Sequence, residues 1–119
     1  MPILSDGLLF IFDMANNHMG DVAHGHRIIE ELARSTSDLG LRCVIKFQYR
    51  DLPNFIHRRY RGRTDIKYVK RFSETRLSAE QFDSLRAAAR EAGFLTMCTP
   101  FDEASVDLIE EQGFDLIKI

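Results

Sequence analysis

Hydrophobic residues along the chain follow two kinds of pattern. Short continuous apolar runs, which are typical of buried strands, occupy residues 8–15, 43–48, 95–99 and 116–119. Between these runs, apolar residues recur at helical spacing, which predicts helices over about 21–39, 78–92 and 103–112. Because the strands are apolar on both faces and alternate with helices, we expect a parallel sheet covered by helices.

The ends of the predicted helices carry recognisable signals. Asp21 suits the N-cap of the first helix. The sequence Ser78-Ala79-Glu80-Gln81 forms a capping box at the start of the second. Gly93 and Gly113 follow the second and third helices, where glycine commonly ends a helix. These signals support the three helix predictions independently of the apolar spacing.

The order of the elements predicts the fold class. A strand followed by a helix occurs three times, a fourth strand closes the chain, and a long insertion at about 49–77 follows the second strand. This (βα)3β order with parallel strands predicts an α/β fold, the N-terminal half of a (β/α)8 TIM barrel. We expect residues 1–119 to form one partial, truncated barrel domain.

A lysine interrupts the second apolar run. With the two-residue period of a strand, Lys46 and Gln48 lie on one face. The opposite face carries Cys43, Ile45 and Phe47. A buried lysine costs free energy unless an anion meets it. This strand is therefore a candidate floor for an acidic small molecule.

The other strands repeat this arrangement, with apolar residues early and a polar residue late on the inward face. The polar residues on this face are Asp13, Lys46, Gln48, Thr99 and Lys118. Because the carboxyl ends of parallel strands line the active site, these side chains are expected to converge. Their excess of positive charge suits a phosphate or carboxylate. As an alternative, Asp13 pairs structurally with Lys46 or Lys118, and Thr99 caps the turn.

Composition narrows the class of protein. The 119 residues are 45% hydrophobic and 29% charged, as in a globular chain, and the net charge of -2 gives no general attraction to nucleic acid or membrane. No apolar run approaches the roughly 20 residues of a membrane helix, and residues 1–6 lack the basic start of a signal peptide. A cytoplasmic protein is expected, with Cys43 and Cys98 as reduced core thiols.

The insertion is rich in basic and aromatic residues. Its basic residues are Arg58, Arg59, Arg61, Arg63, Lys67, Lys70 and Arg71. Three interpretations of this segment are open. It is a lid or subunit contact over an acidic substrate, a solvated face of the protein, or a patch that binds nucleic acid. The net charge argues against the last of these.

Four short motifs, in this order, resemble the sialic acid synthase (N-acetylneuraminate synthase) family. They are the segment 13–20 after the first strand, Lys46-Phe47-Gln48, Thr99-Pro100-Phe101-Asp102 and Ile117-Lys118-Ile119. The resemblance covers nearly the whole chain and implies a TIM barrel that condenses phosphoenolpyruvate with N-acetylmannosamine or a related N-acetylated amino sugar, releasing phosphate.

The resemblance also implies roles for individual residues. By position, Lys46, Thr99 and Lys118 hold phosphoenolpyruvate, and Gln48 touches the sugar. Asp13 stands where the family has a glutamate that handles the substrate or a proton.

At the mouth of the site, Asn17 and His18 match the family's turn after the first strand and are expected to shape the entrance. Phe101 packs at this mouth or in the core.

A divalent metal, manganese or magnesium, is implied for the full-length family. Its two histidine ligands lie in the later half of the family's barrel, so no metal ligand is expected in this chain, and the chain is not expected to turn over alone.

Two alternatives stay open. The first is a non-catalytic half-barrel that works as an assembly unit and forms a homo-oligomer through its open edges. The second is a related phosphoenolpyruvate-using 3-deoxy-sugar-acid synthase or aldolase barrel, which fits the strand ends but fits the turn at Asn17 and His18 less well.

Overall fold

The computed structural model of the chain describes residues 7–119. The strands are β1 (Leu9–Asp13), β2 (Arg42–Tyr49), β3 (Leu95–Pro100) and β4 (Leu116–Ile117). The helices are α1 (Val22–Thr36), α2 (Leu52–Phe55), α3 (Lys67–Glu74), α4 (Ala79–Glu91) and α5 (Glu103–Gln112), with a 3-10 turn η1 (Arg58–Tyr60). The signal-peptide expectation falls on residues 1–6, outside the described residues. Within residues 7–119, no helix is both long and apolar enough to cross a membrane.

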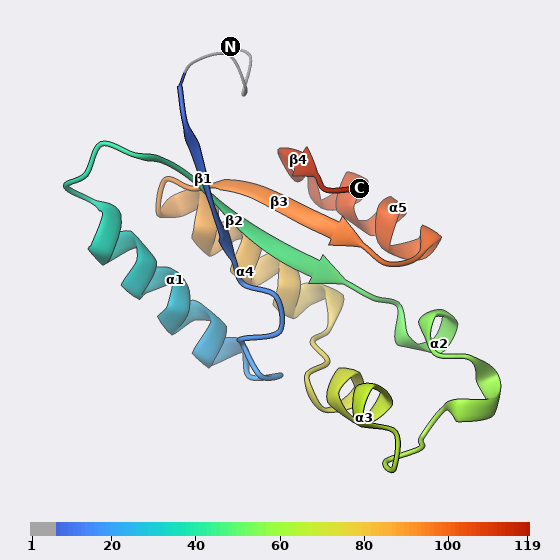
Figure 1. Cartoon of the computed structure of the whole chain (residues 1–119). Helices are drawn as coiled ribbons and strands as arrows, with labels where there is room; N and C mark the ends of the chain where they lie inside the picture. The colour runs from blue at the N-terminus through green and yellow to red at the C-terminus, as the bar shows by residue number, and fades with distance from the viewer. Residues whose placement is uncertain (1–6) are drawn as a thin grey trace.

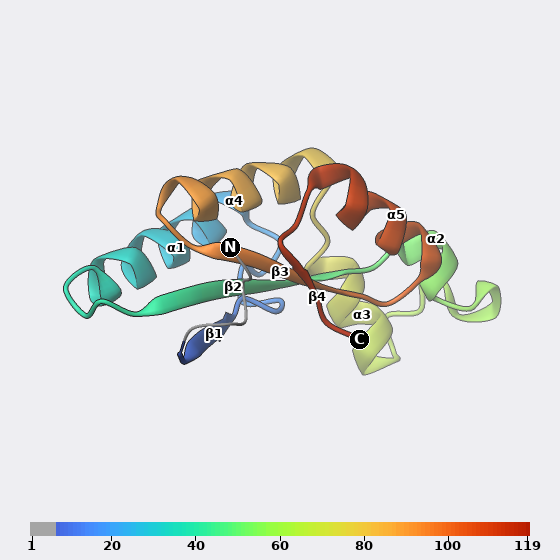
Figure 2. The same ribbon diagram turned by 90° about the horizontal axis from the view of Figure 1, so that it is seen from above.

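The four strands form one parallel sheet in the order β1-β2-β3-β4 (Figure 1). Figure 2 shows α1, α4 and α5 together on one side of this sheet. Strand order that follows chain order, with helices on a single side, is the arrangement of consecutive units in a (β/α)8 barrel. The predicted parallel α/β fold and partial barrel are confirmed.

The main core lies between the sheet and these helices. Phe47 on β2 is fully buried and packs edge-on against Phe114 at a ring separation of 6.0 Å. From the helices, Ile29, Leu85 and Ile109 complete the same cluster. The apolar spacing along each helix therefore faces the sheet, as the sequence predicts.

The opposite side of the sheet is partly exposed. Ile11 on β1, on the face of Lys46, is 48% exposed; at the other edge Ile117, which lies on the helical face, is 45% exposed. Exposed apolar side chains at open sheet edges are a requirement of the assembly-unit hypothesis. They are equally compatible with a partial barrel, so they do not separate the two interpretations.

Most helix boundaries follow the sequence signals. Asp21 Oδ1 accepts a hydrogen bond from the Ala23 amide at 2.9 Å, and Ser78 and Gln81 form the predicted capping box. Gly113 ends α5 in the left-handed conformation with φ of 73°. The prediction that the first helix runs to residue 39 is wrong: α1 ends at Thr36, whose hydroxyl donates to the Leu32 carbonyl, and a turn follows.

The outer strands are shorter than predicted. β1 covers residues 9–13 of the expected 8–15, and β4 covers 116–117 of the expected 116–119. Each has a single strand neighbour in the described sheet, which limits its ladder. Beyond β4, the Lys118 amide still donates to the Cys98 carbonyl at 3.0 Å, so the extended path continues.

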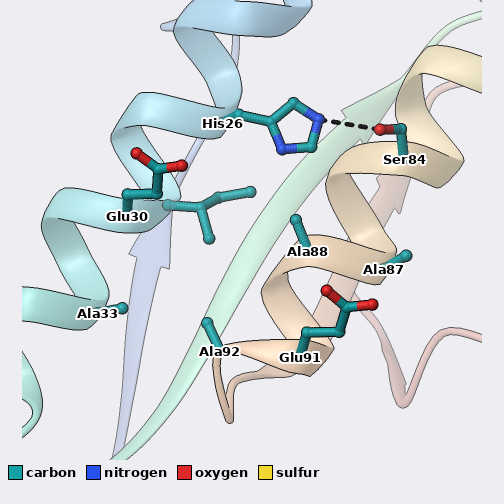
Figure 3. A pocket seen from close by; sticks show the side chains of 9 residues that line it. His26, Glu30, Ala33, Ser84, Ala87, Ala88, Glu91 and Ala92 are labelled. Carbon is teal, nitrogen blue, oxygen red and sulfur yellow. Dashed lines mark hydrogen bonds between the residues drawn. The ribbon is translucent and has the colours of Figure 1, made fainter.

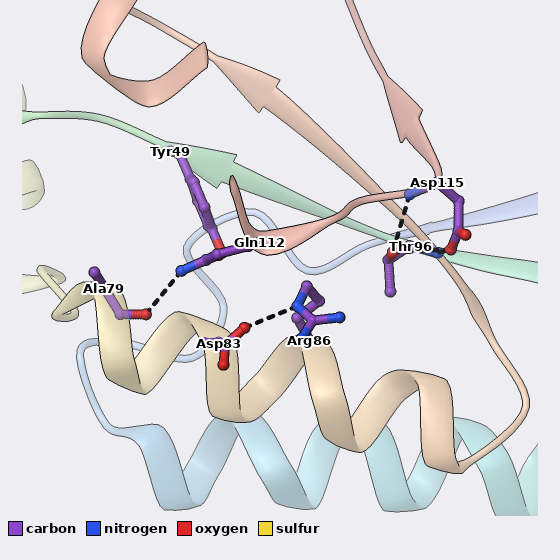
Figure 4. A network of polar contacts seen from close by, with 7 residues as sticks. All are labelled: Tyr49, Ala79, Asp83, Arg86, Thr96, Gln112 and Asp115. Carbon is purple, nitrogen blue, oxygen red and sulfur yellow. Dashed lines mark hydrogen bonds and ion pairs between the residues drawn. The ribbon is translucent and has the colours of Figure 1, made fainter. Parts of the chain in front are cut away.

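A polar network joins the sheet to the helices on its covered side (Figure 4). The Asp115 carboxylate accepts from the Thr96 amide at 2.8 Å and from its hydroxyl at 3.0 Å. Tyr49 donates its hydroxyl to Gln112 Oε1 at 2.6 Å, and Gln112 donates to the Ala79 carbonyl at the start of α4. Because Tyr49 is buried, its phenol pKa is raised and it remains a donor. The network fixes β2 and β3 relative to α4 and α5.

Candidate functional site

The strand register brings polar side chains together at the carboxyl ends. Asp13 on β1 lies opposite Lys46 on β2, and Gln48 lies opposite Thr99 on β3. Lys118 follows Leu116 by two residues, and Leu116 lies opposite Met97, so the period of two assigns Lys118 to the same face. The predicted shared face is thus the one that the sheet presents away from its helices. The roles assigned to these residues stay predictions.

Lys46 and Asp13 form an ion pair across β1 and β2. Lys46 Nζ lies 3.0 Å from Asp13 Oδ2, and the side chains are 17% and 46% exposed respectively. The sequence left open whether Asp13 pairs with Lys46 or with Lys118. The structure shows that Asp13 pairs with Lys46. This carboxylate offsets part of the cost of holding a lysine at the sheet surface.

Arg50 is a site residue that the sequence reasoning missed. It follows β2 directly and continues the alternation of Lys46 and Gln48 by two residues, so the strand period was the signal that could have found it. Its Nη2 donates to Gln48 Oε1 at 2.7 Å and its Nη1 to Asn16 Oδ1 at 3.2 Å. The guanidinium carbon lies 4.1 Å from the ring centre of Phe72 and 4.3 Å from that of Phe101.

Phe101 lies at the mouth of the site. It is 41% exposed, contacts the ring of Phe55 at 5.8 Å, and donates its amide to the Tyr49 carbonyl. The structure therefore favours the mouth over the core among the two positions considered. Asp102 holds this turn, because its carboxylate accepts from the Asp51 amide and caps α5.

The turn after β1 places Asn17 and His18 in different surroundings. Asn17 is exposed and donates to the Asp13 carbonyl at 3.4 Å, as suits a residue near the entrance. His18 is fully buried, with its ring edge-on to Phe82 at 5.7 Å. In this position its ring packs against α4 and is shielded from solvent, and the role of His18 at the mouth stays a prediction.

Burial determines the charge of His18. Its Nδ1 accepts from the Gly20 amide at 3.1 Å, so the ring is neutral with its proton on Nε2. Burial, together with smaller effects of nearby His24 and Arg50, lowers the His18 pKa from 6.5 to about 4. His18 is therefore a structural residue whose protonation is disfavoured in the folded state.

This burial predicts a pH-dependent stability. Unfolded His18 titrates near 6.5 and folded His18 near 4, so the unfolded state binds more protons between these values. The contribution of neutral His18 to the free energy of unfolding is complete above about pH 6.5. It is lost as the pH falls towards 4, and the loss is about 3 kcal/mol at most. Urea unfolding at several pH values should show a flatter profile for His18→Asn. His57→Asn, which changes an exposed histidine, should keep the wild-type profile; an unchanged profile in His18→Asn would contradict the assignment.

The described residues do not fit a metal site. Within residues 7–119, no group of three or more His, Cys, Asp and Glu side chains is placed to hold a metal ion. His26 instead shares a hydrogen bond with Ser84 at 2.9 Å, and His57 accepts from the Arg59 amide.

Two of the hollows in the structure lie away from the strand ends. A groove of about 660 Å³ separates α1 from α4, with the His26–Ser84 hydrogen bond across it (Figure 3). It lies on the helical side, away from Lys46. A second, apolar hollow of about 380 Å³ lies wholly within the insertion, between Phe55 and Phe72. Neither contains the polar strand-end residues.

Together, the parallel sheet and its polar strand ends define a partial (β/α)8 barrel of the class that binds ligands at the carboxyl ends of its strands. A model of the NeuB family matches residues 33–119, so the chain belongs to the NeuB family. This confirms the resemblance to sialic acid synthases and favours it over other aldolase-like barrels.

Similar proteins extend well beyond the region matched here. A spore coat polysaccharide biosynthesis protein E from Chromobacterium violaceum is 52% identical with a TM-score of 0.91, over 95% of this chain and 34% of that one. An N-acetylneuraminic acid synthetase from Leptospira borgpetersenii, solved with citrate, is 23% identical with a TM-score of 0.76, over 96% and 36%. An uncharacterized protein of Methanocaldococcus jannaschii is 28% identical over 103 residues, 87% of this chain and 27% of its own length. The chain thus spans about a third or less of these relatives.

Proposed function

We propose that the protein takes part in a phosphoenolpyruvate-dependent synthesis of sialic acid or a related amino-sugar acid, in which phosphoenolpyruvate condenses with N-acetylmannosamine or a similar sugar and phosphate is released. Membership of the NeuB family supports the reaction class. The single observation that carries the proposal is Lys46, a lysine only 17% exposed at the carboxyl end of a central strand. A partly buried ammonium group in this position is suited to binding an oxyanion.

In this proposal, Lys46 and Lys118 bind the phosphate and carboxylate of phosphoenolpyruvate, with Thr99 beside them. Their positive charge would stabilise the charge that develops on the substrate oxygens. Asp13 already contacts Lys46 at 3.0 Å, so an incoming oxyanion must share that lysine or displace the carboxylate. In this arrangement Asp13 would also lie close enough to the bound substrate to handle a proton.

The remaining features belong to the complete protein. Gln48 would contact the amino sugar next to the phosphoenolpyruvate site. A manganese or magnesium ion would be held by residues outside 7–119, since those described here do not fit it. A cytoplasmic location and a homo-oligomeric assembly stay predictions.

Calorimetric titration with phosphoenolpyruvate tests the proposal. Lys46→Ala should weaken binding about tenfold or more, because a hydrogen bond to a charged group contributes about 1.5–3 kcal/mol. Arg34→Ala is the control: Arg34 also pairs with a carboxylate, Glu31 at 2.7 Å, but on the exposed helical side. It should leave binding unchanged.

A third variant separates the two roles of Asp13. Asp13→Asn removes the carboxylate that competes for Lys46, so phosphoenolpyruvate should bind more tightly. Equal binding by wild type and Lys46→Ala would contradict the proposal.

A further inference from the structure

Arg50 is a partly buried cation with neutral partners. Within residues 7–119, no Asp or Glu side chain forms an ion pair with it. Its two hydrogen-bond acceptors, Asn16 and Gln48, are side-chain amides. Its Nε is buried without a hydrogen-bond partner. A guanidinium carries five N–H donors, so two more on the terminal nitrogens remain for another acceptor.

The surroundings of Arg50 raise the cost of its charge. Burial lowers the Arg50 pKa, and nearby Arg71 lowers it further. The rings of Phe72 and Phe101 stack against the guanidinium at 4.1 and 4.3 Å, which holds its plane in one orientation. A desolvated guanidinium with a like-charged neighbour is most stable when an anion joins it.

Two hollows adjoin Arg50 at the end of β2. One, of about 20 Å³, is lined by Arg50 with Asn16, Gln48 and Phe72, the residues that contact its guanidinium. The other, of about 200 Å³, extends from Arg50 towards α4 and α5, where Phe82 and Leu108 line it. Asp51 also lines the larger hollow, and its carboxylate accepts from the Asn54 side chain. Arg76 lines both hollows, so a second arginine lies near Arg50 at the end of β2.

Arg50 also continues the line of site residues along β2. Lys46, Gln48 and Arg50 alternate on one face, each about 7 Å further towards the mouth than the one before. We infer that Arg50 binds an oxyanion, a phosphate or carboxylate, that a substrate of the proposed synthase carries at the mouth of the site. The inference rests on the proposed function for the identity of the substrate, and the oxyanion belongs to phosphoenolpyruvate or to an acidic acceptor sugar.

Titrations at constant ionic strength test this inference. The probes are inorganic phosphate, phosphoenolpyruvate, N-acetylmannosamine and its phosphate ester. Arg50→Gln should bind inorganic phosphate at least about tenfold more weakly than wild type. Arg50→Lys keeps the charge and should recover part of the affinity. Arg58→Gln, which changes an exposed arginine of η1, should bind as wild type does.

The probes identify the source of the oxyanion. Weaker phosphoenolpyruvate binding in Arg50→Gln assigns the group to phosphoenolpyruvate. An effect confined to the phosphorylated sugar assigns it to the acceptor. Unchanged affinity of Arg50→Gln for every anionic probe would overturn the inference.

The result is separable from the test of the proposed function. If Lys46→Ala loses phosphoenolpyruvate and Arg50→Gln loses no anion, the inference fails and the proposed function stands. If inorganic phosphate depends on Arg50 but phosphoenolpyruvate does not bind, the anion site stands and the proposed function fails.

A second measurement covers the case in which neither variant folds. Phenylglyoxal modifies accessible guanidinium groups, and mass spectrometry locates the modified residues. Inorganic phosphate should slow modification of Arg50 in the wild-type protein and leave Arg58 unaffected. Equal rates at Arg50 with and without phosphate would overturn the inference.

Discussion

Phe47→Ala is expected to lower the free energy of unfolding by about 3–5 kcal/mol, the range for removing a large buried aromatic side chain. Phe47 is fully buried between β2 and the helical layer and packs edge-on against Phe114. Urea unfolding of wild type and variant measures the difference.

Ile11→Ala is the matched control for the opposite face. Ile11 is 48% exposed on β1, so its truncation should cost less than about 1 kcal/mol. The contrast between the two variants measures how differently the two sides of the sheet are buried. A cost for Ile11→Ala as large as that for Phe47→Ala would show that the open side is covered in solution, which the assembly-unit hypothesis requires.

Gly20→Ala is expected to destabilise the protein by about 3 kcal/mol or more, for two reasons that add. Gly20 has a φ of +73°, which disfavours any residue with a Cβ, and that Cβ would lie 2.6 Å from the Glu74 carbonyl oxygen. The carbonyl is part of the backbone at the end of α3, so it can move only if the insertion moves. Thermal unfolding should show a marked decrease in the midpoint.

Gly40→Ala separates the two causes. Gly40 has a φ of +62° but no atom within 4 Å of the position of a Cβ, so only the backbone cost of about 1–2 kcal/mol applies. The excess for Gly20→Ala measures the close contact between the turn after β1 and the insertion. Equal losses in both variants would show that this contact is absent in solution.

The Gly20 contact bears on the site, since it positions the segment that carries Phe72. Phe72 lies in α3, next to Glu74, and stacks on Arg50. The insertion therefore reaches the strand ends through α3. That the insertion closes over an acidic substrate stays a prediction.

Local sequence determined the elements and the faces of this protein. Caps at Asp21 and Ser78 act within one turn of chain, so the sequence alone predicts where α1 and α4 begin. The two-residue period of a strand assigned Lys46 and Gln48 to one face and Phe47 to the other. These features depend on neighbours in the chain and need no tertiary information.

Tertiary structure decided which polar groups meet. Asp13 had two lysines available by sequence, and the adjacency of β1 and β2 selects Lys46. His18 is buried because its turn packs against Phe82 of α4, a contact that no local pattern shows. Arg50 belongs to the site because Asn16, Phe72 and Phe101, from separate parts of the chain, surround its guanidinium. Distance, burial and desolvation between segments remote in sequence are properties of the packed fold, so the sequence by itself determined the faces and the tertiary structure decided the partners.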